Sequence, residues 1–149
     1  MKILLTTDGS EYSTAAAEKL CDVFGGLSDS EIKVVSVYEP MQPIAAEPFA
    51  VSAEYYNEIS EASRNQAASF ASAAADLVKG RCPEARISNE VLSGKPAPQI
   101  VQFAEKWGAD LIIVGSHGRG FWGRLLGSVS NGIVNHAPCT VMVVRKSPD

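Results

Sequence analysis

The segment from Gly115 to Ser128 carries the residues whose types and spacing best support chemistry. Its sequence is GSHGRGFWGRLLGS, with five glycines in 14 residues, between a short apolar run and a predicted helix. Glycine lets a ligand approach the backbone closely, and a helix start offers unpaired N–H groups to an anion. Ser116 adds a hydroxyl group, and Arg119 and Arg124 add positive charge. The segment predicts a phosphate site, although a glycine loop ending in a serine cap explains the same residues without a ligand.

Two established phosphate motifs do not fit this sequence. The spacing of Gly118 to Gly123 matches G-x-G-x-x-G, but that fingerprint belongs to the first strand-to-helix turn of a dinucleotide-binding unit. Gly94 and Lys95 are followed by Pro96, and position 89 is Asn89 where a P-loop requires glycine. The predicted phosphate site is therefore of another type.

His117 is the residue of the segment with the chemistry of a base. A histidine here either donates to phosphate or acts as a general base, and the absence of a G-x-S-x-G nucleophile favours phosphate contact. His136 shows no metal-ligand spacing with His117 and suits a helix end better. Glu58 and Glu61 are neighbours on a predicted helix and are explained by a solvated helix face. The sequence therefore predicts no catalytic or metal-ligating set.

Five short segments have the composition of strands. Apolar, β-branched runs predict parallel strands buried on both faces at residues 3–5, 32–37, 111–114 and 140–144, and a half-exposed edge strand at 87–92. Strands that alternate with helices predict a Rossmann-like α/β sheet with helices on both faces. In such a sheet, ligands bind beyond the carboxyl ends of the strands.

Four helices are predicted between these strands. The first begins after Ser10 and ends at Gly25, the second covers 52–79 with Gly80 as its stop, the third covers 96–107, and the fourth begins at Gly127 and Ser128. Apolar spacing assigns to their inner faces Val23 in the first helix, Val134 in the fourth, and, in the second, Ile59, Ala62, Phe70, Ala74, Leu77 and Val78.

Composition limits the class of protein. The 149 residues are 46% hydrophobic and 20% charged, as expected of one soluble globular domain over residues 1–149. Thirteen basic against seventeen acidic residues give a net charge of −4, which argues against nucleic acid or an anionic membrane as a partner. No apolar run is long enough to span a membrane.

The three cysteines and one long connection bear on the cell compartment and on the surroundings of the site. Cys21, Cys82 and Cys139 fit neither a disulfide framework nor a zinc pattern, so a reducing cytoplasm is expected. Residues 38–51 contain Pro40, Pro43 and Pro48 and are longer than a usual strand-to-helix loop. They are expected to form a mobile loop, either a flap near the site or a linker.

Motifs along nearly the whole chain resemble those of the universal stress protein family. They are ILLTTDGS at 3–10, VVSV at 34–37, ADLIIVGSHG at 109–118, and GSVS at 127–130 followed by APCTVMVVR at 137–145. The resemblance implies a sheet in the order 3-2-1-4-5. ATP-binding members carry G-x2-G-x9-G-S/T; Gly115, Gly118, Gly127 and Ser128 follow this pattern, except that eight residues separate Gly118 from Gly127.

The resemblance also implies a site for ATP, ADP or AMP, with Mg²⁺ arriving on the nucleotide. Asp8 would bind the ribose or the base, Val37 and Val114 would line the adenine pocket, and glycines with their neighbours would surround the phosphates. The implied site residues are Thr7, Asp8, Val37, Val114, Gly115, His117, Gly118, Gly127, Ser128 and Val129. Asp8 also suits a helix cap or turn, and Val37 also suits the core.

A homodimer joined through the last strand is implied as well, at Thr140, Val141, Met142, Val143, Val144 and Arg145. The leading hypothesis is a dimeric stress-response regulator that binds an adenine nucleotide without fast turnover. One alternative is a slow Mg²⁺-dependent ATPase in which Ser128 or His117 positions the γ-phosphate. Another is a dimeric interaction module that binds no nucleotide, because its glycine loop is one residue short.

Overall fold

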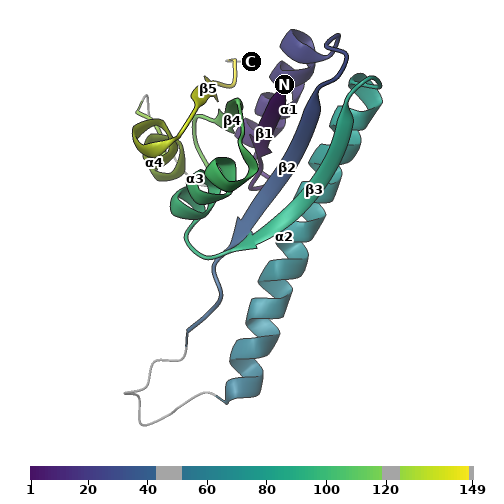
Figure 1. Cartoon of the computed structure of the whole chain (residues 1–149). Helices are drawn as coiled ribbons and strands as arrows, with labels where there is room; N and C mark the ends of the chain where they lie inside the picture. The colour runs from purple at the N-terminus through teal and green to yellow at the C-terminus, as the bar shows by residue number, and fades with distance from the viewer. Residues whose placement is uncertain (43–51, 119–124, 148–149) are drawn as a thin grey trace.

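The chain alternates strands and helices around one parallel sheet (Figure 1). The computed structural model describes residues 1–42, 52–118 and 125–147. Within them the elements are β1 Lys2–Thr6, α1 Glu11–Phe24, β2 Glu31–Tyr38, α2 Ala53–Arg81, β3 Arg86–Ser93, α3 Pro96–Trp107, β4 Leu111–Gly115, α4 Ser128–His136 and β5 Thr140–Val144. The strand order is β3-β2-β1-β4-β5 and all pairs are parallel, so the predicted fold class and order are confirmed.

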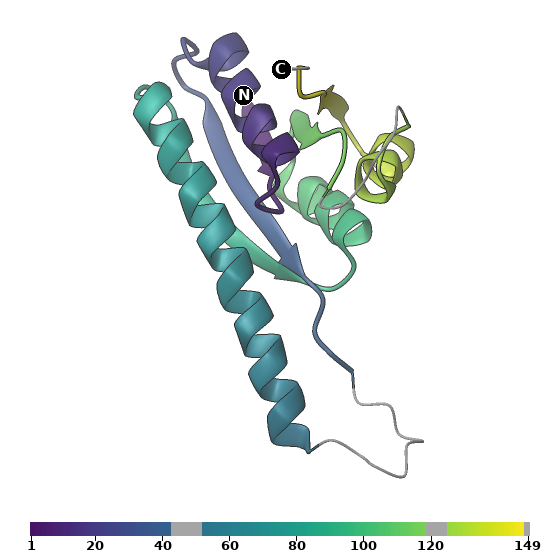
Figure 2. The same ribbon diagram turned by 180° about the vertical axis from the view of Figure 1, so that it is seen from behind.

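The sheet separates two layers of helices, as Figures 1 and 2 show from opposite sides, and apolar side chains fill the space between the sheet and each layer. On one face, Ile3 and Leu5 of β1 pack with α1 and α2. On the other face, Leu4 packs with α3 and α4 through Ile100, Ala104 and Ile133. Because successive side chains of a strand point to opposite faces, β1 is buried in both layers only because Ile3, Leu4 and Leu5 are all apolar.

Local signals in the sequence set most of the helix ends. The Ser10 hydroxyl accepts a hydrogen bond from Ser13 N at 3.2 Å and caps α1, and Gly25 follows its last residue. Pro96 begins α3, and Gly108 ends it in the left-handed conformation at φ 73°. These ends agree with the predictions, because a proline at the first turn and a glycine at the left-handed cap each lower the cost of a helix end.

The end of α2 differs from the prediction. The helix continues through Gly80 to Arg81, and Cys82 leaves it at φ −126° and ψ 64°. Cys82 precedes Pro83, whose ring disfavours the helical conformation in the residue before it. The stop is therefore the proline and not the glycine.

Apolar spacing also assigned three exposed residues to inner helix faces. Ala62 is exposed because the amino-terminal part of α2 extends past the sheet (Figures 1 and 2), and the buried residues of this helix are Ala67, Ala71, Ala75 and Val78. Val23 is 52% exposed and Val134 is 46% exposed. Gly132 faces Ala97 of α3, and Val134 lies two positions later, which is about 200° around the helix. Val134 therefore points away from α3.

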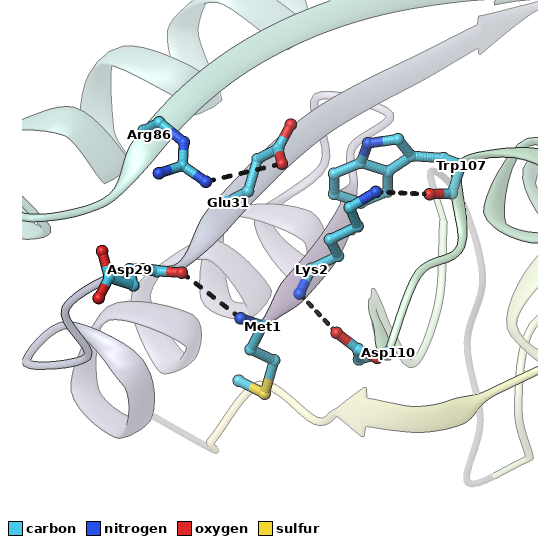
Figure 3. A network of polar contacts seen from close by, with 7 residues as sticks. All are labelled: Met1, Lys2, Asp29, Glu31, Arg86, Trp107 and Asp110. Atoms are coloured by element: carbon cyan, nitrogen blue, oxygen red, sulfur yellow. Dashed lines mark hydrogen bonds and ion pairs between the residues drawn. The ribbon is translucent and has the colours of Figure 1, made fainter.

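Polar contacts fix the amino end of β1 (Figure 3). Lys2 N donates to Asp110 Oδ2 at 2.7 Å, and Asp110 N donates to Lys2 O at 2.8 Å. Lys2 Nζ donates to Trp107 O at 3.1 Å. These bonds hold β1 against the turn before β4 and so maintain the register that pairs Ile3 with Leu111.

The predicted mobile loop at 38–51 stays a prediction, because residues 43–51 lie outside the described part of the chain. Tyr38 is the last residue of β2, and Met41 N donates to Ser60 Oγ of α2 at 3.0 Å.

Replacing either of two glycines with alanine should change the stability of the protein, in opposite directions for the two positions. A Cβ at Gly80 or at Gly108 would meet no atom within 4 Å, but only Gly108 has a positive φ. Gly80→Ala is expected to raise the free energy of unfolding by about 0.5 kcal/mol, because alanine favours a helix. Gly108→Ala is expected to lower it by about 1–2 kcal/mol. Urea unfolding measures both, and equal losses in the two variants would contradict helical continuation through Gly80.

Candidate functional site

A cavity of about 270 Å³ opens where β1 and β4 end side by side. The chain leaves β1 for α1 on one face of the sheet and leaves β4 for α4 on the other, so the two connections diverge and leave a crevice. The cavity is lined by Thr6, Thr7, Asp8, Ser13, Val35, Val37, Pro96, Ile100, Val114, Gly115, His117, Gly118, Gly127, Ser128, Val129 and Ser130. All ten site residues expected from the sequence are among them.

A turn after β1 places Asp8 at the cavity. Asp8 Oδ1 accepts from Ser10 N at 3.0 Å, so one carboxylate oxygen holds the start of α1. Thr7 Oγ1 accepts from Gly9 N at 3.2 Å and donates to Ser13 Oγ at 3.1 Å. The turn role that the sequence left open for Asp8 is thus present, and it uses one oxygen only.

The second oxygen of Asp8 lies close to the backbone that follows β4. A Cβ built at Gly118 would lie 2.8 Å from Asp8 Oδ2. The glycine therefore lets the two ends of the site approach each other. Asp8 lines the cavity, and its Oδ2, which the turn does not use, can accept a hydrogen bond from a ligand hydroxyl or amine.

Ser116 holds the start of α4 against the end of β4. Its carbonyl oxygen accepts from Gly127 N at 2.8 Å and from Ser130 Oγ at 2.9 Å. Ser130 and Ser116 are 2% and 1% exposed, so these are buried hydrogen bonds. They fix the first turn of α4 at the cavity.

The first turn of α4 has the chemical character that favours an anion. Gly127 is its N-cap and supplies no side chain to bond the free N–H groups. The first N–H groups of a helix have no partner within the helix, and its dipole favours negative charge there. Ser128 adds a hydroxyl group to the same cavity wall.

The ring of His117 is engaged within the protein. Its Nδ1 lies 2.9 Å from Ser116 Oγ, and its Nε2 is in hydrogen-bonding contact with the carbonyl oxygen of Leu125. One neutral tautomer satisfies both contacts, with Nε2–H donating to Leu125 and Nδ1 accepting from Ser116. The ring is 8% exposed and packs on Tyr12 at 5.2 Å between ring centroids. His117 thus joins the segment at Leu125 to the strand end.

The rest of the wall is apolar. Val35, Val37 and Val114 come from the strands, and Pro96 and Ile100 come from α3. A cavity that combines apolar side chains with a helix N-terminus suits a ligand that carries both a flat ring and an anionic group. Val37 belongs both to this wall and to the packing of the second layer, as the sequence allowed.

Sequence reasoning missed several of these residues. Ser13 shares the first turn of α1 with its cap, which was a usable signal. Pro96 and Ile100 reach the cavity from α3 across the sheet, and spacing carries no sign of that contact. Within the described residues, no group of three or more His, Cys, Asp or Glu side chains is arranged to hold a metal ion, and no helix is long and apolar enough to cross a membrane.

Fold and cavity define the class as a doubly wound parallel α/β domain with a cavity at the switch point. The model of the universal stress protein family matches residues 1–145, so the chain belongs to this family. Universal stress protein MJ0531 of Methanocaldococcus jannaschii is 34% identical over 148 residues, 97% of this chain and 82% of that relative.

Solved structures share the fold. Universal stress protein UspA from Lactobacillus plantarum superposes with a TM-score of 0.82 at 22% identity, over 97% of both chains. A universal stress protein in complex with cAMP has a TM-score of 0.64 at 23% identity, over 99% of this chain and 98% of that one. A family member from Arabidopsis thaliana with AMP bound has a TM-score of 0.66 at 20% identity, over 100% of this chain and 94% of that one.

Gly115 is expected to be required by the fold itself. A Cβ at this position would lie 2.8 Å from the carbonyl carbon and oxygen of Tyr12, which belong to the backbone of α1 and cannot rotate away. Gly115→Ala should therefore lower the free energy of unfolding by about 1–3 kcal/mol in the absence of any ligand. Denaturant unfolding tests this. Gly26→Ala is the matched control, because a Cβ there meets nothing within 4 Å; equal stability of the two variants would contradict the close approach.

Proposed function

We propose that this chain binds an adenine nucleotide in the switch-point cavity and acts in the cytoplasm as a dimeric stress-response regulator. The observation that carries the proposal is that one cavity is lined by the uncapped α4 N-terminus, by Asp8 and by apolar side chains. The AMP and cAMP complexes of two proteins with the same fold support an adenine nucleotide as the ligand class.

Each part of a nucleotide has a fitting part of the cavity. The phosphates would lie at the first turn of α4, near Gly127, Ser128 and Val129. The adenine ring would lie against Val37 and Val114. Asp8 Oδ2 would accept from the ribose hydroxyls. A Mg²⁺ ion would arrive with a triphosphate, since Asp8 is the one carboxylate among the described residues that line the cavity.

Binding without fast turnover fits the chemistry of this wall better than catalysis does. His117 has both ring nitrogens engaged by Ser116 and Leu125, so its ring is not offered to a ligand as a base. A regulator needs only a difference in stability or shape between its free and bound states.

Nucleotide binding is expected to raise the melting temperature in a concentration-dependent way. A ligand that binds only the folded state stabilises it by about 2.7 kcal/mol at 100 times its Kd. Mass spectrometry of small molecules released from the purified protein, followed by thermal-shift titration with AMP, ADP, ATP and cAMP, identifies the ligand. No release and no shift with any of them would favour the interaction-module hypothesis. Phosphate release from ATP in the same samples tests slow hydrolysis.

Gly118→Ala is expected to weaken nucleotide binding with little effect on the fold. The added Cβ would lie 2.8 Å from Asp8 Oδ2, and the carboxylate can rotate away only by leaving its place at the cavity. Gly118 does not have a positive φ, so alanine is not strained there. We expect Kd to rise about tenfold, which is roughly 1.4 kcal/mol.

The matched control for this variant is again Gly26→Ala, whose Kd should equal that of the parent protein. Calorimetry measures affinity, and denaturant unfolding of each ligand-free variant separates loss of binding from loss of stability. An unchanged Kd for Gly118→Ala would contradict the role of Asp8.

The proposed dimer uses the free edge of β5. Val144 O accepts from Ser116 N at 2.8 Å, so the backbone groups of Val144 point toward β4. Because backbone groups alternate in direction along a strand, those of Val143 point to the open edge. That edge carries the partly buried side chains Val141, Met142 and Val143, and an unpaired strand edge favours pairing with another strand.

Val143→Pro is expected to weaken the dimer by about tenfold in Kd, because proline removes one outward N–H donor from each copy. The β4–β5 ladder keeps its inward bonds. Analytical ultracentrifugation over a concentration series measures the effect. Val143→Ala retains the donor and is the control; a dimer that tolerates proline as well as alanine would rule out pairing at this position.

A further inference from the structure

Two thiols that lie far apart in the sequence touch in the core. Cys21 belongs to the last turns of α1, and Cys82 directly follows α2, 61 positions later. The Cys82 thiol donates to Cys21 Sγ with 3.2 Å between the sulfurs. Their exposed fractions are 7% and 1%, and both are free thiols. Neither lies at the nucleotide cavity, so nothing proposed above uses them.

The segments that carry the thiols are also held together at the surface. The next residue after Cys21 is Asp22, and the residue before Cys82 is Arg81. Arg81 donates from its guanidinium group to Asp22 Oδ1 at 2.6 Å. This ion pair is a second contact between the end of α1 and the end of α2, beside the contact of the two thiols. The sulfurs need to approach by only about 1 Å to reach the bond length of a disulfide, which is roughly 2.05 Å.

We propose that Cys21 and Cys82 form an intramolecular disulfide when the protein is exposed to a peroxide. In the first step a thiolate sulfur attacks one oxygen of hydrogen peroxide and the O–O bond breaks. The products are a sulfenic acid and hydroxide, which takes the thiol proton and becomes water. In the second step the other sulfur attacks the sulfenic sulfur, the S–O bond breaks, and the released hydroxide becomes water with the second thiol proton. Two thiols lose two electrons, and peroxide is reduced to two waters.

Burial makes this reaction slow. Burial, together with the neighbouring Cys82 thiol, raises the pKa of the Cys21 thiol to about 12, and only the thiolate is a good nucleophile. The pair therefore stays reduced during brief contact with oxidant and responds to prolonged contact. Cys139 is only partly buried and is the natural comparison within the same chain.

The disulfide would connect the end of α1 to the end of α2 and close the chain between Cys21 and Cys82 into a loop. A crosslink over so long a loop restricts the unfolded chain and so stabilises the folded state. Because the thiols already touch in the reduced protein, little native geometry must change. The oxidised protein is therefore expected to melt several degrees higher than the reduced protein.

The full chain is incubated with hydrogen peroxide for hours and then denatured in the presence of iodoacetamide, which alkylates the remaining free thiols. The protein is digested and the peptides are analysed by mass spectrometry. The expected product is one peptide pair joined through Cys21 and Cys82, lighter than the two free peptides by two hydrogen atoms. Dithiothreitol should restore both the free peptides and the original melting temperature. Two results would overturn the proposal. One is that Cys21 and Cys82 are both alkylated after prolonged oxidation, and the other is that they are linked only to Cys139 or only between chains.

Variants separate the pair from other thiols. Cys139→Ala should retain the crosslink and the rise in melting temperature on oxidation. Cys82→Ala should lose both. The melting temperature of each oxidised variant is compared with that of its own reduced form. A general loss of stability from an altered core lowers both temperatures and does not affect their difference. A rise of the same size in Cys82→Ala would contradict the disulfide as its cause.

Discussion

The pairing of β1 with β4 is the constraint on which the rest of this structure depends. Both strands are buried on two faces, so the residues between their ends are apolar, and Ile3, Leu4 and Leu5 are fully buried. Right-handed crossovers then direct α1 to one face and α4 to the other. The backbone must separate after Thr6 and after Gly115, and the separation is the cavity. The site is thus a consequence of topology, and its side chains determine only what it binds.

The same crowding explains the glycines around the cavity. Gly115 passes the backbone of Tyr12, Gly118 passes the carboxylate of Asp8, and a Cβ at Gly127 would lie 3.3 Å from His117 Cα. The sequence segment looked like a phosphate loop because glycine serves both for ligand approach and for approach of the chain to itself. In this protein the second requirement already accounts for Gly115. The glycine cap also leaves the first N–H groups of α4 without a side-chain partner, and these are the groups that the proposed ligand would bind.

Periodicity predicted the sheet and the helices because burial on one or two faces leaves a direct record in side-chain type. It did not predict that Ala62 is exposed, since a helical stripe gives direction around an axis and not the length of the sheet beneath it. The ten expected residues that line the cavity came from a resemblance and from strand ends, both of which are local in sequence. The engagement of the His117 ring and the contact between Cys21 and Cys82 depend on packing between separate elements, and spacing carries no trace of them.

Ser116 joins the two regions that the proposed function uses. Its N–H donates to Val144 O of the edge strand at 2.8 Å, and its carbonyl accepts from Gly127 N at 2.8 Å. The open edge of β5 and the first turn of α4 are therefore connected through one buried residue and two hydrogen bonds. A shift of α4 on anion binding would change the position of the Ser116 carbonyl, and a partner strand on β5 would constrain the N–H of the same residue. Ser116 is therefore hydrogen-bonded to both parts of the proposed function, and a variant at this position would show whether the proposed dimer edge and the proposed ligand site affect each other.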